Sequence, residues 1–206
     1  NMPNERLRRA ALIKSNLERI NPLVGEIQEY LRELTWQDLP LEIEDFNNMT
    51  RYSLVLPDHI ETNYSTLVGI LENETDPNIK KIYHNTIFGD PQEKFNGLTL
   101  SVQALHLHNN RVHYPGPGLA VKYRNLGLGK KIYKRIIYDR GHITSYDTDT
   151  LGVSADNSIE SDLIWHSLYT DDEIDCQTDG NKIIAIFAEY QPALQRTINQ
   201  YFGIVQ

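Results

Sequence analysis

Two glycines between an expected strand and an expected helix constrain this 206-residue chain more than any other feature. Residues 118–121 favour a short extended segment, and residues 128–138 repeat apolar side chains at helical spacing. Gly127 and Gly129 carry no side chain, so an anion could approach the backbone N–H groups at the start of that helix. Lys130 adds positive charge at the same end. The segment therefore predicts an α/β unit with an anion site where the helix begins.

Two common phosphate-binding loops do not match this segment. A P-loop would need a glycine where Arg124 stands and a serine or threonine where Lys131 stands. A dinucleotide-binding fingerprint beginning at Gly127 would need a glycine or alanine in place of Ile132. The pattern that remains is Arg-x-x-Gly-x-Gly over residues 124–129.

This pattern resembles the pyrophosphate-binding signature of the GNAT superfamily of acyl-CoA N-acyltransferases. The order of elements is also similar over residues 98–190: a strand, the loop, a long helix, then strand, helix and strand. The resemblance implies that the loop amides hold the pyrophosphate of acetyl-CoA and that the preceding strand holds its pantetheine arm. The residues that it assigns to this cosubstrate are Leu119, Ala120, Val121, Arg124, Asn125, Leu126, Gly127, Leu128, Gly129 and Lys130.

The catalytic groups are less clearly marked. Many members of this family use a tyrosine on the helix after the fifth strand to protonate the departing CoA thiolate. Trp165 stands at that position here, and an indole N–H cannot protonate the thiolate at neutral pH. Tyr169, one turn further along the same expected helix, is the candidate acid.

A general base is expected among the histidines near the strands. If Asn109-Asn110 is a two-residue hairpin turn, His106 pairs with His113, and His108 lies on the same sheet face. His106 and His108 are therefore the candidate bases. Three clustered histidines could also bind zinc, but no closing ligand motif accompanies them, and we expect no metal.

The rest of the chain predicts an α/β (α+β) fold with a mixed central sheet flanked by helices. Expected strands are 52–56, 98–108, 111–114, 142–146 and 182–188, and expected helices are 4–20, 22–34, 60–72, 78–88, 158–169 and 192–202. Pro22 is expected to open the second of these helices. Residues 1–50 are interpreted as an N-terminal helical extension and residues 51–206 as the GNAT-like domain.

Composition limits the partners. The formal net charge of −8 argues against general nucleic-acid binding, and no apolar run reaches membrane-spanning length. The single cysteine, Cys176, cannot form an internal disulfide and suits a reducing compartment, so a cytoplasmic location is expected. The acidic run at residues 171–173 is interpreted as a solvated loop.

Three functions from different classes follow. The first is an N-acetyltransferase that transfers an acyl group from acetyl-CoA, or a related acyl-CoA, to an amine by direct attack. The alternative is a catalytically degenerate GNAT-like module with a structural role, in which residues 4–34 bind a partner chain. Such degenerate copies resemble those of phage proteins, which makes a virion component the alternative location. A small nucleotide-binding domain ranks third.

Overall fold

The computed structural model describes residues 2–46, 49–89, 101–106, 112–113, 120–145, 159–180 and 182–190. The chain forms two compact units, each assembled from three segments. Unit 1 comprises residues 1–34, 55–99 and 118–128, and unit 2 comprises residues 35–54, 100–117 and 129–206. This division differs from the expected boundary at residue 50, because the N-terminal helix shares its unit with segments from the middle of the chain.

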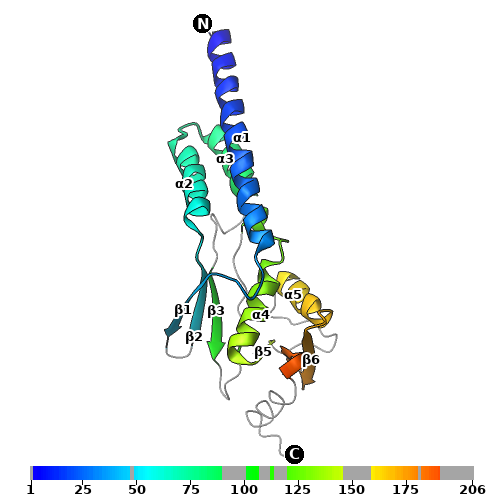
Figure 1. Ribbon diagram of the computed structural model, residues 1–206. Coiled ribbons are helices and arrows are strands. Elements are labelled where there is room, and N and C mark those ends of the chain that lie inside the picture. The colour runs from blue at the N-terminus through cyan, green and yellow to red at the C-terminus, as the bar shows by residue number, and fades with distance from the viewer. Residues whose placement is uncertain are drawn as a thin grey trace, which may run out of the picture. The chain divides into compact units, whose positions relative to one another are not determined.

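Unit 1 is helical (Figure 1). It contains α1 (Met2–Glu33), α2 (Asp58–Asn73), α3 (Pro77–Phe88) and the short 3₁₀ turn η2 (Val121–Tyr123). The helix α1 packs against both α2 and α3. The core is formed by apolar side chains at helical spacing, which include Ile20, Val24, Ile27, Leu31, Ile60, Leu67, Ile79, Tyr83 and Ile87.

The expected break at Pro22 is wrong, because α1 is one continuous helix with Pro22 inside it. A proline within a helix removes one backbone hydrogen bond and costs about 3 kcal/mol. Ile20 and Val24 on either side of Pro22 are buried, while Pro22 itself is exposed. Burial of the apolar stripe on both sides of the proline offsets the lost hydrogen bond.

The expected start of α3 is confirmed. The Asp76 side chain accepts hydrogen bonds from the backbone N–H groups of Asn78 and Ile79, at 2.8 and 3.4 Å. Pro77 occupies the first turn of the helix, where its missing N–H group has no cost. The boundaries of α2 and α3 fall within two residues of those expected.

Unit 2 contains one seven-stranded sheet with the order β1-β2-β3-β4-β5-β7-β6. Its strands are β1 (Leu41–Phe46), β2 (Met49–Leu54), β3 (Ser101–His106), β4 (Val112–His113), β5 (Ile143–Thr144), β6 (Ile174–Asp179) and β7 (Lys182–Phe187). All neighbouring strands are antiparallel except β4 and β5, which are parallel and meet at His113 and Thr144. The general prediction of a mixed α and β fold is therefore confirmed.

Two helices accompany this sheet, α4 (Leu128–Arg140) and α5 (Ile159–Tyr169). Along the chain, α4 connects the two parallel strands, and α5 connects β5 to β6. Gly141 ends α4 with a φ of 86° and donates its N–H to the Ile137 carbonyl at 2.7 Å, which confirms the expected glycine cap. Both helices agree with the sequence expectation; the helix expected at 192–202 lies outside the described residues.

Three strand-level expectations need correction. Val121–Tyr123 forms a 3₁₀ turn, so only Ala120 of the expected extended segment at 118–121 is seen to be extended. The register of β3 and β4 pairs Leu105 with His113 and His106 with Val112. His106 and His113 are therefore not partners, and the expected register is wrong by one residue. The third correction concerns β1 and β6, which the sequence did not predict.

Candidate functional site

The glycine loop enters α4 through two residues with left-handed backbone conformations. Asn125 has a φ of 62° and Gly127 a φ of 78°. Asparagine tolerates this region, whereas most other side chains are strained there. Arg124 before them is extended, and α4 begins at Leu128, which is buried. The conformation of Gly127 is thus a backbone requirement of the turn into the helix.

The segment just before this loop is held by hydrogen bonds to α1 and α3 of its own unit. The buried Tyr123 hydroxyl donates to the Ile87 carbonyl at 3.0 Å, and the Gln28 side-chain amide donates to the Lys122 carbonyl at 2.8 Å. Burial, followed by the neighbouring Tyr64, raises the pKa of Tyr123, so its phenol stays protonated and can donate. These two hydrogen bonds fix the backbone from which the loop departs.

Gly129 has a different role from Gly127. It lies in the first turn of α4, and a Cβ atom there would stand 2.6 Å from Cδ1 of Ile164 on α5. The absence of a side chain therefore lets α4 and α5 approach each other. Tyr133 and Trp165 make a second contact between the same helices, with ring centroids 5.9 Å apart in an edge-to-face arrangement.

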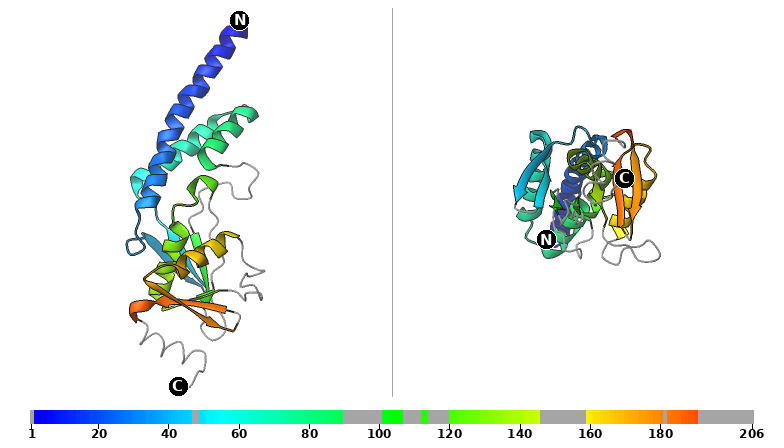
Figure 2. Two further views of the ribbon diagram at one scale, coloured as in Figure 1. Left: turned by 90° about the vertical axis from the view of Figure 1, so that its right-hand side faces the viewer. Right: turned by 90° about the horizontal axis from the view of Figure 1, so that it is seen from below.

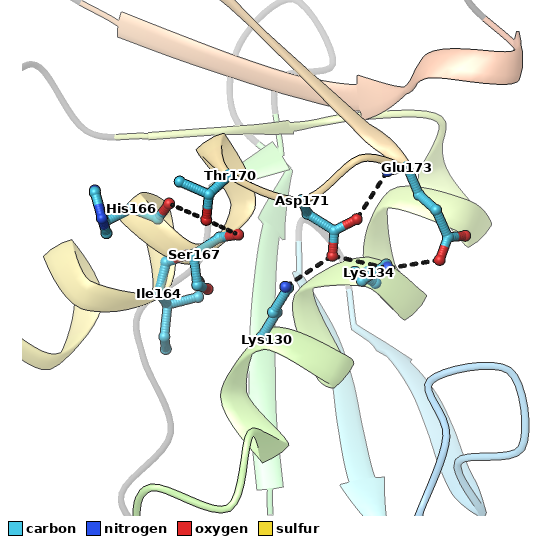
Figure 3. A network of polar contacts seen from close by, with 8 residues as sticks. All are labelled: Lys130, Lys134, Ile164, His166, Ser167, Thr170, Asp171 and Glu173. Carbon is cyan, nitrogen blue, oxygen red and sulfur yellow. Dashed lines mark hydrogen bonds and ion pairs between the residues drawn. The ribbon is translucent and has the colours of Figure 1, made fainter.

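Four charged side chains form a network at the start of α4 (Figure 3). Asp171 binds Lys130 at 2.8 Å and Lys134 at 3.0 Å, and Glu173 binds Lys134 at 3.2 Å. The side chains of Lys134 and Asp171 are 7% and 10% exposed, whereas that of Lys130 is 33% exposed. Lys130, assigned to the cosubstrate by resemblance, is thus held by a carboxylate.

The environment of Asp171 favours its charged form. Burial alone would raise the pKa of this carboxyl group, but hydrogen bonds from Lys130, from the Glu173 backbone N–H and from Lys134 hold the pKa below its ordinary value. The ammonium group of Lys134 also lies 5.8 Å from the centre of the Trp36 ring. The interpretation of this acidic run as a solvated loop is wrong for Asp171, and β6 follows it directly.

The candidate catalytic residues are not brought together by any contact that the structure describes. Tyr169 ends α5 and is 59% exposed, while Trp165, one turn earlier, is 7% exposed. His106 closes β3. His108, like Leu119 of the proposed cosubstrate set, lies outside the described residues. The roles of Tyr169, His106 and His108 stay predictions.

Sequence reasoning missed Asp171, Lys134 and Thr144. No local pattern marks Asp171, because its lysine partners precede it by 37 residues or more along the chain. Thr144 has a buried side chain on β5, and its position opposite His113 of β4 becomes known only from the topology of the sheet. The sequence offers one signal of this charged network. Lys130 stands in the first turn of the expected helix, where a cation is unfavourable unless a carboxylate compensates it.

Other features of the described residues give no competing site. A shallow hollow on unit 1 follows α2 and is lined by Asp58, Glu61, Thr62, Ser65 and Thr66, a mildly acidic set unsuited to phosphates. No group of three or more histidine, cysteine, aspartate or glutamate side chains could hold a metal ion in the ranges that the structure covers. Within those same ranges, no helix is long and apolar enough to cross a bilayer.

Comparison of the chain with models of protein families, with curated proteins and with solved structures finds no match.

Proposed function

We propose that this chain binds acyl-CoA and acts as an N-acyltransferase of the GNAT type, with acetyl-CoA as the donor. The observation that carries the proposal is the parallel pair β4 and β5, the only parallel pair among the described strands, which is connected by a helix that begins at the Arg-x-x-Gly-x-Gly loop. Strand pairing along the described sheet changes from antiparallel to parallel at this pair, and the crossover between its two strands contains the glycine loop and α4. Neither the P-loop nor the dinucleotide fingerprint accounts for the same loop.

The loop offers the chemistry that a pyrophosphate requires. The start of an α-helix such as α4 offers backbone N–H groups that have no partner within the helix, together with the positive end of the helix dipole. Gly127 leaves the approach to these groups free of a side chain, and Lys130 in the same turn, although paired with Asp171, keeps its side chain one-third exposed. Gly129 fits a different role, since the space beside it is filled by Ile164.

The proposed reaction is a direct transfer. A bound acyl-CoA supplies a thioester carbonyl; the amine nitrogen forms a bond to that carbon, the carbon–sulfur bond breaks, and the amine proton passes to a base. His106 and His108 are the proposed bases, and Tyr169 is the proposed donor of a proton to the departing thiolate. The exposure of the Tyr169 side chain leaves it accessible to a ligand.

The binding step is tested with variants of Asn125, which is exposed and already has the left-handed conformation that glycine adopts freely. In Asn125→Asp, a negative charge beside the pyrophosphate should weaken CoA binding at least about tenfold. Asn125→Gly retains the backbone conformation without the charge and is the matched control, for which unchanged binding is expected. Isothermal titration of the full chain with CoA, ATP and NAD provides the measurement. No heat with CoA for the unaltered chain, or equal affinity of both variants, would reject the proposal.

A degenerate module that binds acyl-CoA without transfer is the second candidate, and the burial of Trp165 favours it. This indole packs against Tyr133 at the position where the family carries its acid, so it can supply no proton there. In addition, α1 extends past α2 and α3 (Figure 2), and Leu7 and Leu12 on it are 69% and 56% exposed. These exposed apolar side chains are available to the partner chain that the second candidate requires. Release of free CoA thiol from acetyl-CoA in the presence of small amines and peptide N-termini separates the two candidates. Binding without thiol release would favour the degenerate module.

A further inference from the structure

Three buried hydroxyl groups lie on or beside the strands of unit 2, and they differ in whether they have a hydrogen-bond partner. Thr50 donates to Asp45 at 2.8 Å, and Ser145 accepts the Ile183 N–H at 2.9 Å. Thr144 is 1% exposed, and its Oγ1 has no hydrogen-bond partner in the part of the chain that the structure describes. A buried hydroxyl without a partner is unfavourable, since it gives up its hydrogen bonds to water and gains none.

Packing alone does not explain a threonine at this position. Valine has nearly the same shape and the same preference for strands, and it would fill the site without an unmet hydrogen bond. Ile184, the registered partner of Thr144 on β7, lies on the same sheet face and is apolar and buried. A polar group that the fold itself does not use, among apolar neighbours, is the pattern expected of a group that a ligand completes.

The place of Thr144 in the sheet indicates which part of a ligand it would meet. It is the β5 member of the parallel pair, opposite His113 of β4. Among the described residues, His113 and Thr144 are the only pair that joins β4 to β5. A ligand arm that entered between these strands would therefore disrupt the backbone pairing of one residue pair and not a long run of hydrogen bonds. The strand β4 precedes the glycine loop along the chain, and α4 leads from that loop to β5.

We propose that the Thr144 hydroxyl hydrogen-bonds an amide of the pantetheine arm of the acyl-CoA. This inference rests on the proposed function and adds a positioning residue to the same site. The arm carries two secondary amides, each with an N–H donor and a carbonyl acceptor, and a hydroxyl can serve either. The contact orients the thioester; it does not take part in proton transfer.

The test compares Thr144→Val with Thr144→Ser in the full chain, using two probes. One probe is CoA, and the other is adenosine 3′,5′-bisphosphate, which carries the adenosine and phosphates but no pantetheine arm. Thr144→Val should bind CoA about fivefold to tenfold more weakly, the loss of one hydrogen bond, with unchanged affinity for the bisphosphate. Thr144→Ser should restore CoA binding.

A stability measurement without ligand distinguishes this role from a structural one. Thr144→Val should unfold at the same temperature as the unaltered chain or higher, because it removes an unmet hydrogen bond. Ser145→Ala is the matched control; it deletes a neighbouring buried hydroxyl that has a partner, and it should lower the unfolding temperature.

The possible failures are separable. Absence of CoA binding by the unaltered chain rejects the proposed function and this inference with it. CoA binding that Thr144→Val leaves unchanged, or weakens equally with bisphosphate binding, rejects the inference alone. A loss of stability in Thr144→Val as large as that in Ser145→Ala also rejects it, because the hydroxyl then serves the fold.

Discussion

At the residue scale, Asp171 compensates two lysines, one of which is almost fully buried. The Lys134 side chain is 7% exposed and binds both Asp171 and Glu173, while Lys130 binds Asp171. A buried ammonium group that loses one carboxylate retains its cost of leaving water and loses part of its compensation. Asp171→Asn should therefore lower the free energy of unfolding by about 2 kcal/mol, as measured by urea denaturation.

The matched control for this variant is Glu173→Gln. The Glu173 side chain is 58% exposed, so water screens its interaction with Lys134, and a loss below about 1 kcal/mol is expected. Equal losses in the two variants would contradict the role given to Asp171.

The same carboxylate makes a testable contribution to acid stability. Its pKa in the folded chain lies below the ordinary value, so the folded state binds this proton less readily than the unfolded state does. Its contribution to stability is complete above about pH 4, the ordinary range of an aspartate, and is lost as the pH falls through the lowered pKa. Asp171→Asn should therefore flatten the stability profile on the acid side of pH 4 and leave its slope between pH 6 and pH 8 unchanged.

Cys176 is expected to be chemically quiet. Burial, with the charges of Asp175 and Asp171 next, raises the pKa of its thiol to about 12. At pH 8 roughly one thiol in ten thousand is then the reactive thiolate. Iodoacetamide should modify the folded chain at least about a hundredfold more slowly than the chain in urea, as followed by mass spectrometry. Comparable rates would show that the thiol is not in this environment.

At the element scale, the contact between Gly129 and Ile164 fixes the approach of α4 to α5. A Cβ at position 129 would lie 2.6 Å from Cδ1 and 3.3 Å from Cγ1 of Ile164, so this half-buried side chain would have to shift to admit it. Gly129→Ala should cost about 1 to 2 kcal/mol of stability despite the higher helix propensity of alanine. Ile164→Val removes that methyl group.

A double-mutant cycle isolates this contact. The cost of Gly129→Ala should be at least about 0.5 kcal/mol smaller in the Ile164→Val background. Additive effects in thermal unfolding would show that position 129 does not face Ile164. The same result matters for function, because a large substitution at Gly129 would disturb helix packing and could not be interpreted as loss of a ligand contact.

The elements that the sequence predicted are those with a strong local signal. The helices α2 and α3 were marked by an apolar stripe and by Asp76 and Pro77, and α4 by its stripe and by Gly141. The missed strands β1 and β6 are the two edges of the sheet. Their sequences, LEIEDF and IDCQTD, carry acidic residues that are unfavourable in strand interiors but suit an edge open to water.

The candidate site was predictable only as far as its chemistry is local. The sequence pattern predicted a glycine loop that leads into a helix, but it did not predict the left-handed conformation of Gly127. The partners of Gly129 and Lys130 lie 35 and 41 residues further along the chain, at Ile164 and Asp171. The orphaned hydroxyl of Thr144 likewise becomes visible only when the neighbours of β5 are known.

At the scale of the whole molecule, the chain passes between its two units at residues 34–35, 54–55, 99–100, 117–118 and 128–129. Each unit nevertheless has a core of its own, one made by α1, α2 and α3 and the other by the sheet with α4 and α5. The residues interpreted as an N-terminal extension supply Ile20, Val24, Ile27 and Leu31 to the first of these cores. The integrity of unit 1 should therefore depend on α1.

Two probes can follow the two units separately. Both tryptophans, Trp36 and Trp165, belong to unit 2, and α1, α2 and α3 all belong to unit 1. Tryptophan fluorescence therefore reports unit 2, and far-ultraviolet circular dichroism is dominated by the helices of unit 1. Ile27→Ala removes a fully buried side chain from unit 1 and should cost about 2 to 5 kcal/mol. Its dichroism midpoint should fall well below its fluorescence midpoint in urea.

The reciprocal variant completes the argument. Ile136→Ala empties part of the core of unit 2, where Ile136 is fully buried, and it should lower the fluorescence midpoint more than the dichroism midpoint. Leu7→Ala, at a side chain that is 69% exposed on α1, should move neither midpoint by more than about 0.5 kcal/mol. Parallel shifts of both probes in both core variants would mean that the units unfold as one cooperative block, since non-coincident transitions are the mark of separable ones. Opposite ordering of the midpoints in the two variants is the expected result, because a cavity weakens the core that contains it before it weakens its neighbour.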